Sequence, residues 1–390
     1  MECDVFIIGA GSAGLSTALE CSRRGLDVII IEKCKGIGYG IKTSGHTWIG
    51  EVIRRFGFPR NTYARAINSL YIHSISLDDY VKIKWDRDVL CTLNPTNFYQ
   101  HLTIKSVEHG AKILLNSKPL QTSIKYDKIH EVKVAYNNKQ LTINPKIVVD
   151  ASGYAAVIAR EYGLCGFVKN ENIGFGIEYE MANVDIKEQN TIEYYTGYDV
   201  IPISYAWIGP KSKNRATVGM ATIINSPTKE YEKLQSSGKD IYDCFTKFQL
   251  NHPIASKKLK NAQPLEFHYG FTPLIGVSKK VYDKNILLVG DSASQASPLL
   301  GEGLRFSLIF GQYAGEAIFK AIKLGKSEDE AFNEYQRRVD DYLNVGHYDA
   351  VDSLRIETDE YWNELILKLK KMIRNGDKNA ILPYLKCKGN

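Results

Sequence analysis

Three closely spaced glycines near the N-terminus form a pattern that suits a bound dinucleotide. Residues 9–14 read Gly-Ala-Gly-Ser-Ala-Gly and lie between an apolar run over residues 4–8 and a stretch of helix formers. Gly9 permits a tight turn, Gly11 lets backbone N–H groups approach a pyrophosphate, and Gly14 lets the helix pack closely on the strand.

A carboxylate follows the next apolar run. Glu32 lies directly after residues 28–31, where it can accept hydrogen bonds from ribose hydroxyls and disfavours a 2′-phosphate. The pattern therefore predicts FAD or NAD, rather than NADP, as the bound dinucleotide. A glycine turn in a sheet protein without a ligand is the alternative interpretation.

A second pattern lies near residue 290. An apolar run over residues 286–290 is followed by Asp291 and by a Pro-x-x-Gly-x-Gly turn over residues 298–303. These residues resemble the flavin-binding signature of the p-hydroxybenzoate hydroxylase-like FAD superfamily. The resemblance implies that Asp291 holds a ribityl hydroxyl and that the next helix directs its N-terminus at the flavin, where it stabilises negative charge. Asp291 as a simple helix cap is the alternative.

The middle of the chain carries a third match. Asp150 and Gly153, after an apolar run, resemble the superfamily's mid-chain Asp-Gly signature, where the chain re-enters the FAD domain. By itself, Asp150 is as easily an ordinary turn former at a strand end. The three matches span residues 4–318, and the resemblance implies one bound FAD.

An aromatic segment narrows the resemblance. Tyr205, Trp207 and Pro210 with Lys211 are similar to the aromatic-x-Trp-x-x-Pro-Lys segment of geranylgeranyl reductases, flavoenzymes that saturate prenyl chains of lipids, chlorophyll precursors or quinones. Because they are two residues apart on a strand, Tyr205 and Trp207 share one face and suit a slot for an isoprenoid. Packing inside a sheet core is the alternative. Pro210 is expected to end the strand and aim Lys211, which is otherwise a solvated turn charge.

The chain departs from that family around residue 45. Ser44 stands where the family commonly has the cysteine of a Cys-Gly pair, so a proton relay must use another group. The candidates are Tyr205, His46 or an ordered water. For His46 we expect a hydrogen-bonded loop histidine, because the sequence assigns it no carboxylate partner.

Two further departures affect the cofactor and substrate sites. Asn94 and Pro95 occupy the place of the basic residue that usually precedes the helix expected over residues 97–110, so one FAD contact is missing. Gly209 replaces the usual aromatic residue before the proline, which is expected to widen the pocket.

The candidate site residues follow from these matches. The cofactor-binding residues are Gly9, Gly11, Ser12, Ala13, Gly14, Glu32, Lys33, Asp291, Gly301, Gly303 and Leu304. The catalytic residues are Tyr205, Trp207, Ser44 and Gly45. No metal site is expected, because the seven cysteines are scattered without ligand spacing and should be free thiols.

Composition limits the remaining classes of function. The chain has 390 residues, and 50 basic against 44 acidic residues leave a net charge of +6. This diffuse excess suits an anionic ligand or membrane surface and does not indicate nucleic acid. No apolar run is long enough to span a bilayer and no cleavable signal is visible, which predicts a cytoplasmic protein.

The expected fold is α/β: a Rossmann-like FAD-binding domain, an antiparallel-sheet substrate domain and a helical C-terminal extension. Alternating runs predict antiparallel strands within residues 70–85, 173–181, 191–195 and 216–224, and residues 211–215 resemble a linker. The FAD domain is expected over residues 1–65, 94–165 and 272–330, the substrate domain over residues 66–93 and 166–271, and the helical region over residues 331–390.

The end of the chain is expected to form an amphipathic basic helix. Its apolar face carries Trp362, Leu365, Ile366, Leu369 and Ile373. The helix either makes a peripheral membrane contact or docks on the core. No second dinucleotide fingerprint follows, so the electron donor, NAD(P)H or a ferredoxin-like carrier, is expected to bind transiently.

These observations favour an FAD-dependent reductase that saturates the isoprenoid double bonds of a prenylated lipid or quinone. Flavin N5 is expected to deliver hydride to one alkene carbon, and an acid to protonate the other. Two alternatives stay open. One is an aromatic monooxygenase of the same fold, and the other is a flavin or lipid carrier without turnover.

Overall fold

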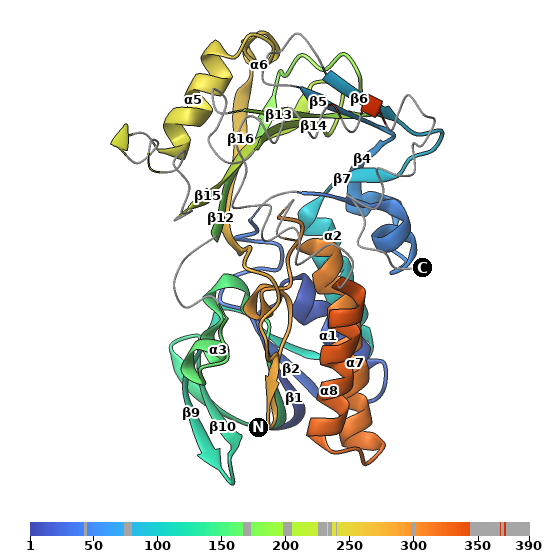
Figure 1. The fold of residues 1–390 in the computed structure, drawn as a ribbon. Helices are drawn as coiled ribbons and strands as arrows, with labels where there is room; N and C mark the ends of the chain where they lie inside the picture. The colour runs from blue at the N-terminus through green and yellow to red at the C-terminus, as the bar shows by residue number, and fades with distance from the viewer. Residues whose placement is uncertain are drawn as a thin grey trace. The chain divides into compact units, whose positions relative to one another are not determined.

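The chain divides into two compact units, each assembled from separated segments. The computed structural model describes residues 1–42, 45–73, 80–166, 173–197, 205–224, 240–297 and 301–343, together with residues 232, 236–238, 367, 370 and 371 (Figure 1). Unit 1 comprises Met1–Gly40, Thr96–Lys169 and Thr272–Val345. Unit 2 comprises Ile41–Pro95, Asn170–Phe271 and Gly346–Asn390.

A largely parallel sheet forms the centre of unit 1. Its strands are ordered β17-β18-β11-β1-β2-β8, and neighbouring strands are parallel except β17 with β18. The bounds are β1 Glu2–Ile8, β2 Val28–Ile31, β8 Lys112–Leu114, β11 Lys139–Asp150, β17 Tyr282–Asp283 and β18 Ile286–Leu288. Val5, Phe6 and Ile7 in the central strand are fully buried, as expected for a strand covered on both faces. β9 (Ser117–Lys125) and β10 (Lys128–Tyr136) extend β11 as antiparallel strands.

Two glycines let helices α1 and α7 of unit 1 touch along their lengths. α1 (Ser12–Ser22) follows β1, and α7 (Leu304–Lys323) packs beside it (Figure 1). A Cβ on Gly311 would lie 2.7 Å from the backbone oxygen of Ala13, and one on Gly315 would lie 2.5 Å from the Cβ of Glu20. The other helices of unit 1 are α2 Pro95–Glu108, α3 Val157–Glu161 and α8 Glu328–Leu343, with short turns η3 Gly153–Ala155 and η4 Gly290–Ala293.

A seven-stranded sheet forms the centre of unit 2, in the order β16-β12-β15-β14-β13-β5-β6. The bounds are β5 Ser69–His73, β6 Tyr80–Lys84, β12 Ile173–Ala182, β13 Thr191–Thr196, β14 Tyr205–Pro210, β15 Arg215–Ile224 and β16 Gln263–Pro273. From β12 to β6 the neighbouring strands are antiparallel, except that β13 and β5 are parallel.

The two faces of this sheet are covered differently. On one face, Tyr195 and Val218 pack with Phe245 and Phe248 beneath α5 (Ile241–Asn251) and α6 (Ala255–Leu259). On the other face, Ile192 packs with apolar residues of a small sheet in the order β3-β7-β4. The bounds of that sheet and its turns are β3 His46–Trp48, β4 Tyr63–Ile67, β7 Leu90–Leu93, η1 Ile49–Arg54 and η2 Arg60–Thr62.

The structure confirms the expected fold class and shifts some boundaries. Residues 211–215, expected as a linker, form a tight turn between β14 and β15, in which Lys211 N donates to Arg215 O at 2.8 Å. Residues 41–65, expected in the FAD domain, belong to unit 2 because β3 and β4 pair with β7. Residues 331–345 cluster with unit 1 because α8 packs on α7. The other domain boundaries differ by four residues or fewer.

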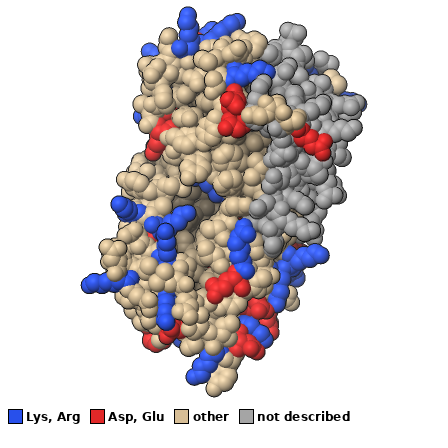
Figure 2. Space-filling view, turned by 90° about the vertical axis from the view of Figure 1, so that its left-hand side faces the viewer, with Lys and Arg blue, Asp and Glu red and all other residues tan. Residues whose placement is uncertain are grey.

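The remaining expectations concern surface charge, the cysteines, metal sites and membrane contact. Basic and acidic side chains are interspersed over the described surface seen in Figure 2. The cysteines that are free thiols in the structure are Cys3, Cys21, Cys34, Cys91, Cys165 and Cys244. Among the described residues, no cluster of His, Cys, Asp and Glu has the arrangement of a metal site, and no helix is long and apolar enough to cross a membrane. The basic helix expected beyond residue 360 lies outside the described residues.

Candidate functional site

The glycine loop between β1 and α1 has the geometry of a phosphate cradle. Gly9 has a φ of +104°, and a Cβ there would lie 2.4 Å from the carbonyl oxygen of Ala151. A Cβ on Gly14 would lie 1.9 Å from the carbonyl oxygen of Gly9, so the fold itself requires both glycines. A Cβ on Gly11, by contrast, meets no protein atom within 4 Å. The space beside Gly11, at the N-terminus of α1, is therefore open to a ligand.

Glu32 ties the end of β2 to this loop. Its Oε2 accepts from the backbone N–H of Ala10 at 2.9 Å, and its Oε1 accepts from that of Cys34 at 2.9 Å. Each carboxylate oxygen keeps a lone pair for a further donor, such as a ribose hydroxyl. Glu32 is half-buried and Lys33 beside it is exposed.

The N-terminus of α7 lies beside Asp291. A Cβ on Gly303, the residue before α7, would lie 3.4 Å from Oδ1 of Asp291. Gly290 packs against α1, because a Cβ there would lie 2.9 Å from the Cβ of Ala13. Gly301 has a φ of +62°, and residues 298–300 of the expected turn lie outside the described residues.

Hydroxyl groups join the first turns of α1 and α7. The Oγ atoms of Ser12 and Ser307 are 2.6 Å apart, and Ser16 donates to the carbonyl oxygen of Leu308 at 2.6 Å. The two helix N-termini therefore converge, and each favours negative charge. These residues fit a cofactor with a pyrophosphate and a ring that becomes negatively charged on reduction.

Asp150 has a structural role. It is fully buried, and its Oδ1 accepts from the N–H and the hydroxyl of Ser152 at 3.0 and 2.6 Å. Its Oδ2 accepts from the N–H groups of Ile158 and Ala159 at 2.8 and 2.9 Å. Burial raises the pKa of this carboxyl group. Because four donors occupy its oxygens, Asp150 holds the turn into α3, as the turn-former alternative requires.

The expected aromatic pair lies on the face of the seven-stranded sheet opposite α5 and α6, which we call the aromatic face. The rings of Tyr205 and Trp207 on β14 have centroids 5.8 Å apart, and Tyr194 on β13 meets Tyr205 edge-on at 5.5 Å. Trp207 is buried, whereas Tyr194 and Tyr205 are half-buried. The three rings form a continuous row.

Neighbouring strands hold the indole of Trp207 in place. Its Nε1 donates to Oε2 of Glu178 on β12 at 3.0 Å. The ring crosses the intervening strand β15 at Gly219, where a Cβ would lie 2.1 Å from Cζ2 of Trp207. The orientation of Trp207 thus depends on Gly219, which has no side chain, and on the buried carboxylate of Glu178.

His46 fills the space expected to be open at Gly209. A Cβ on Gly209 would lie 2.1 Å from Nε2 of His46. His46 is the first residue of β3, and within the described part of the chain its buried Nε2 has no hydrogen-bond partner. The expectations of a hydrogen-bonded loop histidine and of a widened pocket are therefore wrong. Burial lowers the pKa of His46 to about 4, so its imidazole is neutral at pH 7.

Lys211 is buried rather than a solvated turn charge. Its Nζ lies 2.5 Å from Oε2 of Glu180, whose other oxygen pairs with Arg215. Burial lowers the pKa of Lys211. The two cations and the carboxylate close the turn between β14 and β15.

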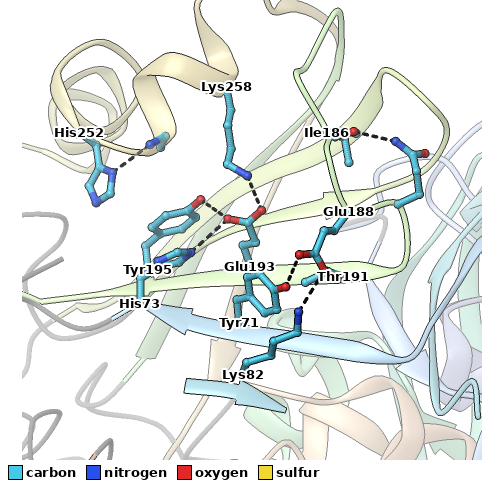
Figure 3. Close-up of polar contacts among 12 residues, drawn as sticks. Tyr71, His73, Lys82, Ile186, Glu188, Thr191, Glu193, Tyr195, His252 and Lys258 are labelled. Carbon is cyan, nitrogen blue, oxygen red and sulfur yellow. Dashed lines mark hydrogen bonds and ion pairs between the residues drawn. The ribbon is translucent and has the colours of Figure 1, made fainter. Parts of the chain in front are cut away.

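A second polar cluster lies on the helix-covered face of the sheet (Figure 3). Glu193 accepts from Tyr195 at 2.7 Å and from Lys258 at 2.5 Å, and lies 3.1 Å from Nε2 of His73. The ring of Tyr195 stacks on His73 and meets His252 edge-on. Although burial opposes it, the contacts with His73 and Lys258 lower the pKa of Glu193 to about 2. This cluster anchors α6 to the sheet and is not on the aromatic face.

Comparison with known proteins identifies the family. The profile described as FAD dependent oxidoreductase matches residues 4–262. A digeranylgeranylglycerophospholipid reductase of Methanocaldococcus jannaschii is 30% identical over 336 residues, which cover 86% of this chain and 81% of that protein. The chain belongs to the geranylgeranyl reductase family of FAD-dependent oxidoreductases.

Solved structures share the fold of this geranylgeranyl reductase family member. A geranylgeranyl bacteriochlorophyll reductase-like protein of Thermoplasma acidophilum aligns with a TM-score of 0.84 at 22% identity, covering 94% of this chain and 91% of that one. A flavin-dependent brominase aligns with a TM-score of 0.75 at 18% identity, covering 97% and 93%.

FAD is the cofactor of this family, and unit 1 has the residues to hold it. The structure places Gly9, Gly11, Ser12, Ala13, Gly14 and Glu32 at one loop, and Asp291, Gly303 and Leu304 at the start of α7. Of the expected catalytic residues, Tyr205 and Trp207 lie together, while Ser44 lies outside the described residues. Gly45 accepts from the N–H of Leu93 at 3.2 Å. Sequence reasoning missed Glu178 and Gly219. The only signal for them was that an acidic residue and a glycine each interrupt an apolar strand.

Proposed function

We propose that the protein reduces the double bonds of isoprenoid chains carried by a lipid or by a quinone. The observation that carries the proposal is the row formed by Tyr194, Tyr205 and Trp207. An isoprenoid chain has no hydrogen-bonding groups, so a rigid aromatic wall is the surface that suits it. The name of the relative from M. jannaschii, a digeranylgeranylglycerophospholipid reductase, favours a lipid.

Unit 1 is the proposed FAD-binding domain. The loop of residues 9–14 and Glu32 would hold the adenosine and pyrophosphate part, and Asp291 with the start of α7 the flavin part. When bound, FAD supplies the hydride. The backbone N–H groups at the N-terminus of α7 stabilise negative charge that lies close to this end of the helix.

Saturation also requires a proton at the second alkene carbon, which we assign to Tyr205. The ring of Tyr205 is half-buried, so its hydroxyl is on a partly open part of the aromatic face. By contrast, Nε2 of His46 is buried against Gly209, and the imidazole is neutral. Trp207, fixed by Glu178, would position the alkene. Ser44 and Gly45 stay catalytic candidates through their position in the family pattern.

The remaining partners are proposals from the sequence. An external donor, NAD(P)H or a ferredoxin-like protein, would reduce the flavin transiently. The basic C-terminal segment would give weak, salt-sensitive contact with anionic membranes.

The test is anaerobic turnover of the reduced holoenzyme. Digeranylgeranylglycerophospholipid and a prenylated quinone are each mixed with it, and flavin reoxidation is followed together with the mass of the product. Reoxidation with a mass gain of two hydrogens per double bond is expected. Oxygen-dependent reoxidation with aromatic substrates, and no saturated lipid or quinone, would support the monooxygenase alternative. A flavin that no donor reduces would support the carrier alternative.

A further inference from the structure

The aromatic face carries glycines inside its strands, where a glycine normally weakens a sheet. Gly209 and Gly219 are required by packing, because an imidazole from β3 and an indole from β14 occupy the places of their side chains. Gly176 on β12 differs from both. Among the described residues, the atoms nearest to a Cβ at position 176 are the backbone oxygen of Met220 at 3.7 Å and the Cβ of Ala221 at 3.8 Å. These are ordinary contact distances, so the fold has room for a side chain here and does not use it.

The backbone gives no other reason for a glycine at position 176. Gly9 needs its φ of +104° for a turn, whereas Gly176 lies within β12 and is not among the described glycines with a positive φ. A β-branched side chain would suit a strand better at such a position. Glycine inside a strand often marks a place where a ligand comes close to the backbone. The missing side chain therefore leaves space that a ligand can use.

Strand register places this open position in line with Tyr205. Gly176 pairs with Ala221 on β15, and Ala221 pairs with Tyr205 on β14. Directly opposite residues share one face of a sheet, so the three positions form a row across three strands. Because neighbouring strands are about 4.8 Å apart, Gly176 lies about 10 Å from Tyr205 along this row. All three residues are half-buried, so the row is partly accessible.

Gly176 and Ala221, which we call the open strip, have apolar neighbours on both sides. On one side lies the indole of Trp207, which crosses β15 toward β12. On the other side lies Ile223, two residues beyond Ala221 and on the same face of β15. The open strip has no polar side-chain atom, and β12 and β15 each have a paired strand on both sides. It therefore offers a ligand apolar contact only, as a hydrocarbon chain requires.

We propose that Gly176 sets the length of the isoprenoid chain that the protein reduces. A chain whose double bond lies beside Tyr205 continues across Ala221 and over Gly176, where the missing side chain leaves it space. A short chain ends before Gly176 and does not need that space. The inference rests on the proposed function, because it takes an isoprenoid chain at Tyr205 as its starting point.

The test compares a long and a short substrate with the full-length holoenzyme. The long one is digeranylgeranylglycerophospholipid, and the short one is the same lipid with geranyl chains of half the length. Gly176→Val should lower kcat/KM for the long lipid about tenfold or more, the scale on which an apolar pocket distinguishes small hydrocarbon groups. The value for the short lipid should stay close to wild type. Gly176→Ala adds one methyl group and should give a smaller loss. Prenylated quinones with long and short chains are compared in the same way.

Two controls separate a lost substrate space from a damaged fold. FAD content of Gly176→Val should equal that of wild type, and its denaturant unfolding should show equal or greater stability, because valine suits a strand. The matched control is Gly50→Val, which adds the same side chain elsewhere in unit 2. A Cβ on the exposed Gly50 meets no described atom within 4 Å, so kcat/KM for both substrates should be unchanged.

The outcomes distinguish this inference from the proposed function. An equal loss for the long and the short substrate in Gly176→Val would show that Gly176 does not select by chain length. An unchanged kcat/KM for the long substrate would show that the chain does not pass over β12. Either result overturns the inference and leaves the proposed function standing, provided that wild type saturates the chains. A wild type that saturates no prenyl chain would overturn both.

Discussion

The imidazole of His46 occupies the place of a side chain on Gly209, because a Cβ at position 209 would lie 2.1 Å from its Nε2. No Cβ tolerates a heavy atom at that distance without a shift. An aromatic residue at position 209, directly before Pro210, is therefore incompatible with His46 in this position. The two residues are expected to change together.

Gly209→Phe should destabilise the protein by about 1–3 kcal/mol, the usual range for overpacking. In the double variant with His46→Ala, the new ring takes the vacated space, so the loss should be smaller than in Gly209→Phe alone. Denaturant unfolding of the wild type, the two single variants and the double variant measures this coupling. Strictly additive losses would show that the two side chains do not compete.

The glycine loop separates a folding requirement from a cofactor requirement. A Cβ at position 11 would meet no protein atom within 4 Å, so Gly11→Val should fold normally with little or no bound FAD. Gly14→Val forces a side chain into the carbonyl oxygen of Gly9 and should lose the fold itself. Flavin absorbance of the purified variants and their unfolding curves distinguish the two effects. A yellow, normally loaded Gly11→Val would contradict the assignment.

Much of the fold could be predicted, because local patterns determine it. The run before Gly9 and the glycine spacing indicate a strand, a turn and a helix, and the structure has them. The alternation over residues 173–181 and 216–224 likewise predicts β12 and β15. These signals depend only on residues that are neighbours in sequence.

The site was harder to predict, because its contacts join distant residues. The hydrogen bond between Trp207 and Glu178 joins β14 to β12 across β15, and the contact of His46 with Gly209 joins β3 to β14. No periodicity records such pairs. The role of Glu32 was predictable, but its bond to the N–H of Ala10 was visible only in the structure.

Acid should weaken the protein in two steps. Burial lowers the pKa of His252 from 6.5 to about 4, so between these values the unfolded chain binds a proton that the folded chain does not. The free energy of unfolding should therefore fall as the pH drops from 6.5 toward 4. Glu193, whose pKa is lowered from 4.5 to about 2, adds a further loss below pH 4.5.

His252→Asn tests the first step. Nδ1 of His252 accepts from the N–H of Ala255 at 3.1 Å at the start of α6, a role that an asparagine oxygen can replace. The unfolding free energy of the variant should fall less steeply than that of the wild type between pH 6.5 and 4. The part of the fall that comes from His46 should remain, because burial lowers the pKa of His46 as well. Unfolding curves at several pH values measure the slope. A slope equal to that of the wild type would exclude His252 as a source.

Glu178→Gln should act on the substrate through Trp207. The amide can still accept from the indole Nε1 but loses its charge, so Trp207 should keep its place and turnover should change little. Glu178→Ala leaves the indole free to move and should lower turnover of a prenylated lipid while FAD content is unchanged. Steady-state rates and flavin content of both variants, beside Trp207→Ala, provide the measurement. Equal rates in Glu178→Ala and wild type would show that Trp207 needs no anchor.

The proton source gives the last prediction. Tyr205→Phe preserves the ring contacts with Tyr194 and Trp207 and removes only the hydroxyl. If that hydroxyl protonates the second alkene carbon, reoxidation of reduced flavin by the lipid should slow on the order of a hundredfold or more, the usual scale for a lost general acid. FAD content and lipid affinity should stay close to wild type, because the aromatic row is intact.

Ser44→Cys introduces the family's thiol, and in the Tyr205→Phe background it should restore part of the rate by supplying a different acid. Stopped-flow reoxidation under nitrogen measures both variants. A Tyr205→Phe rate equal to that of wild type would assign the proton to another group and leave Tyr205 as part of the apolar wall.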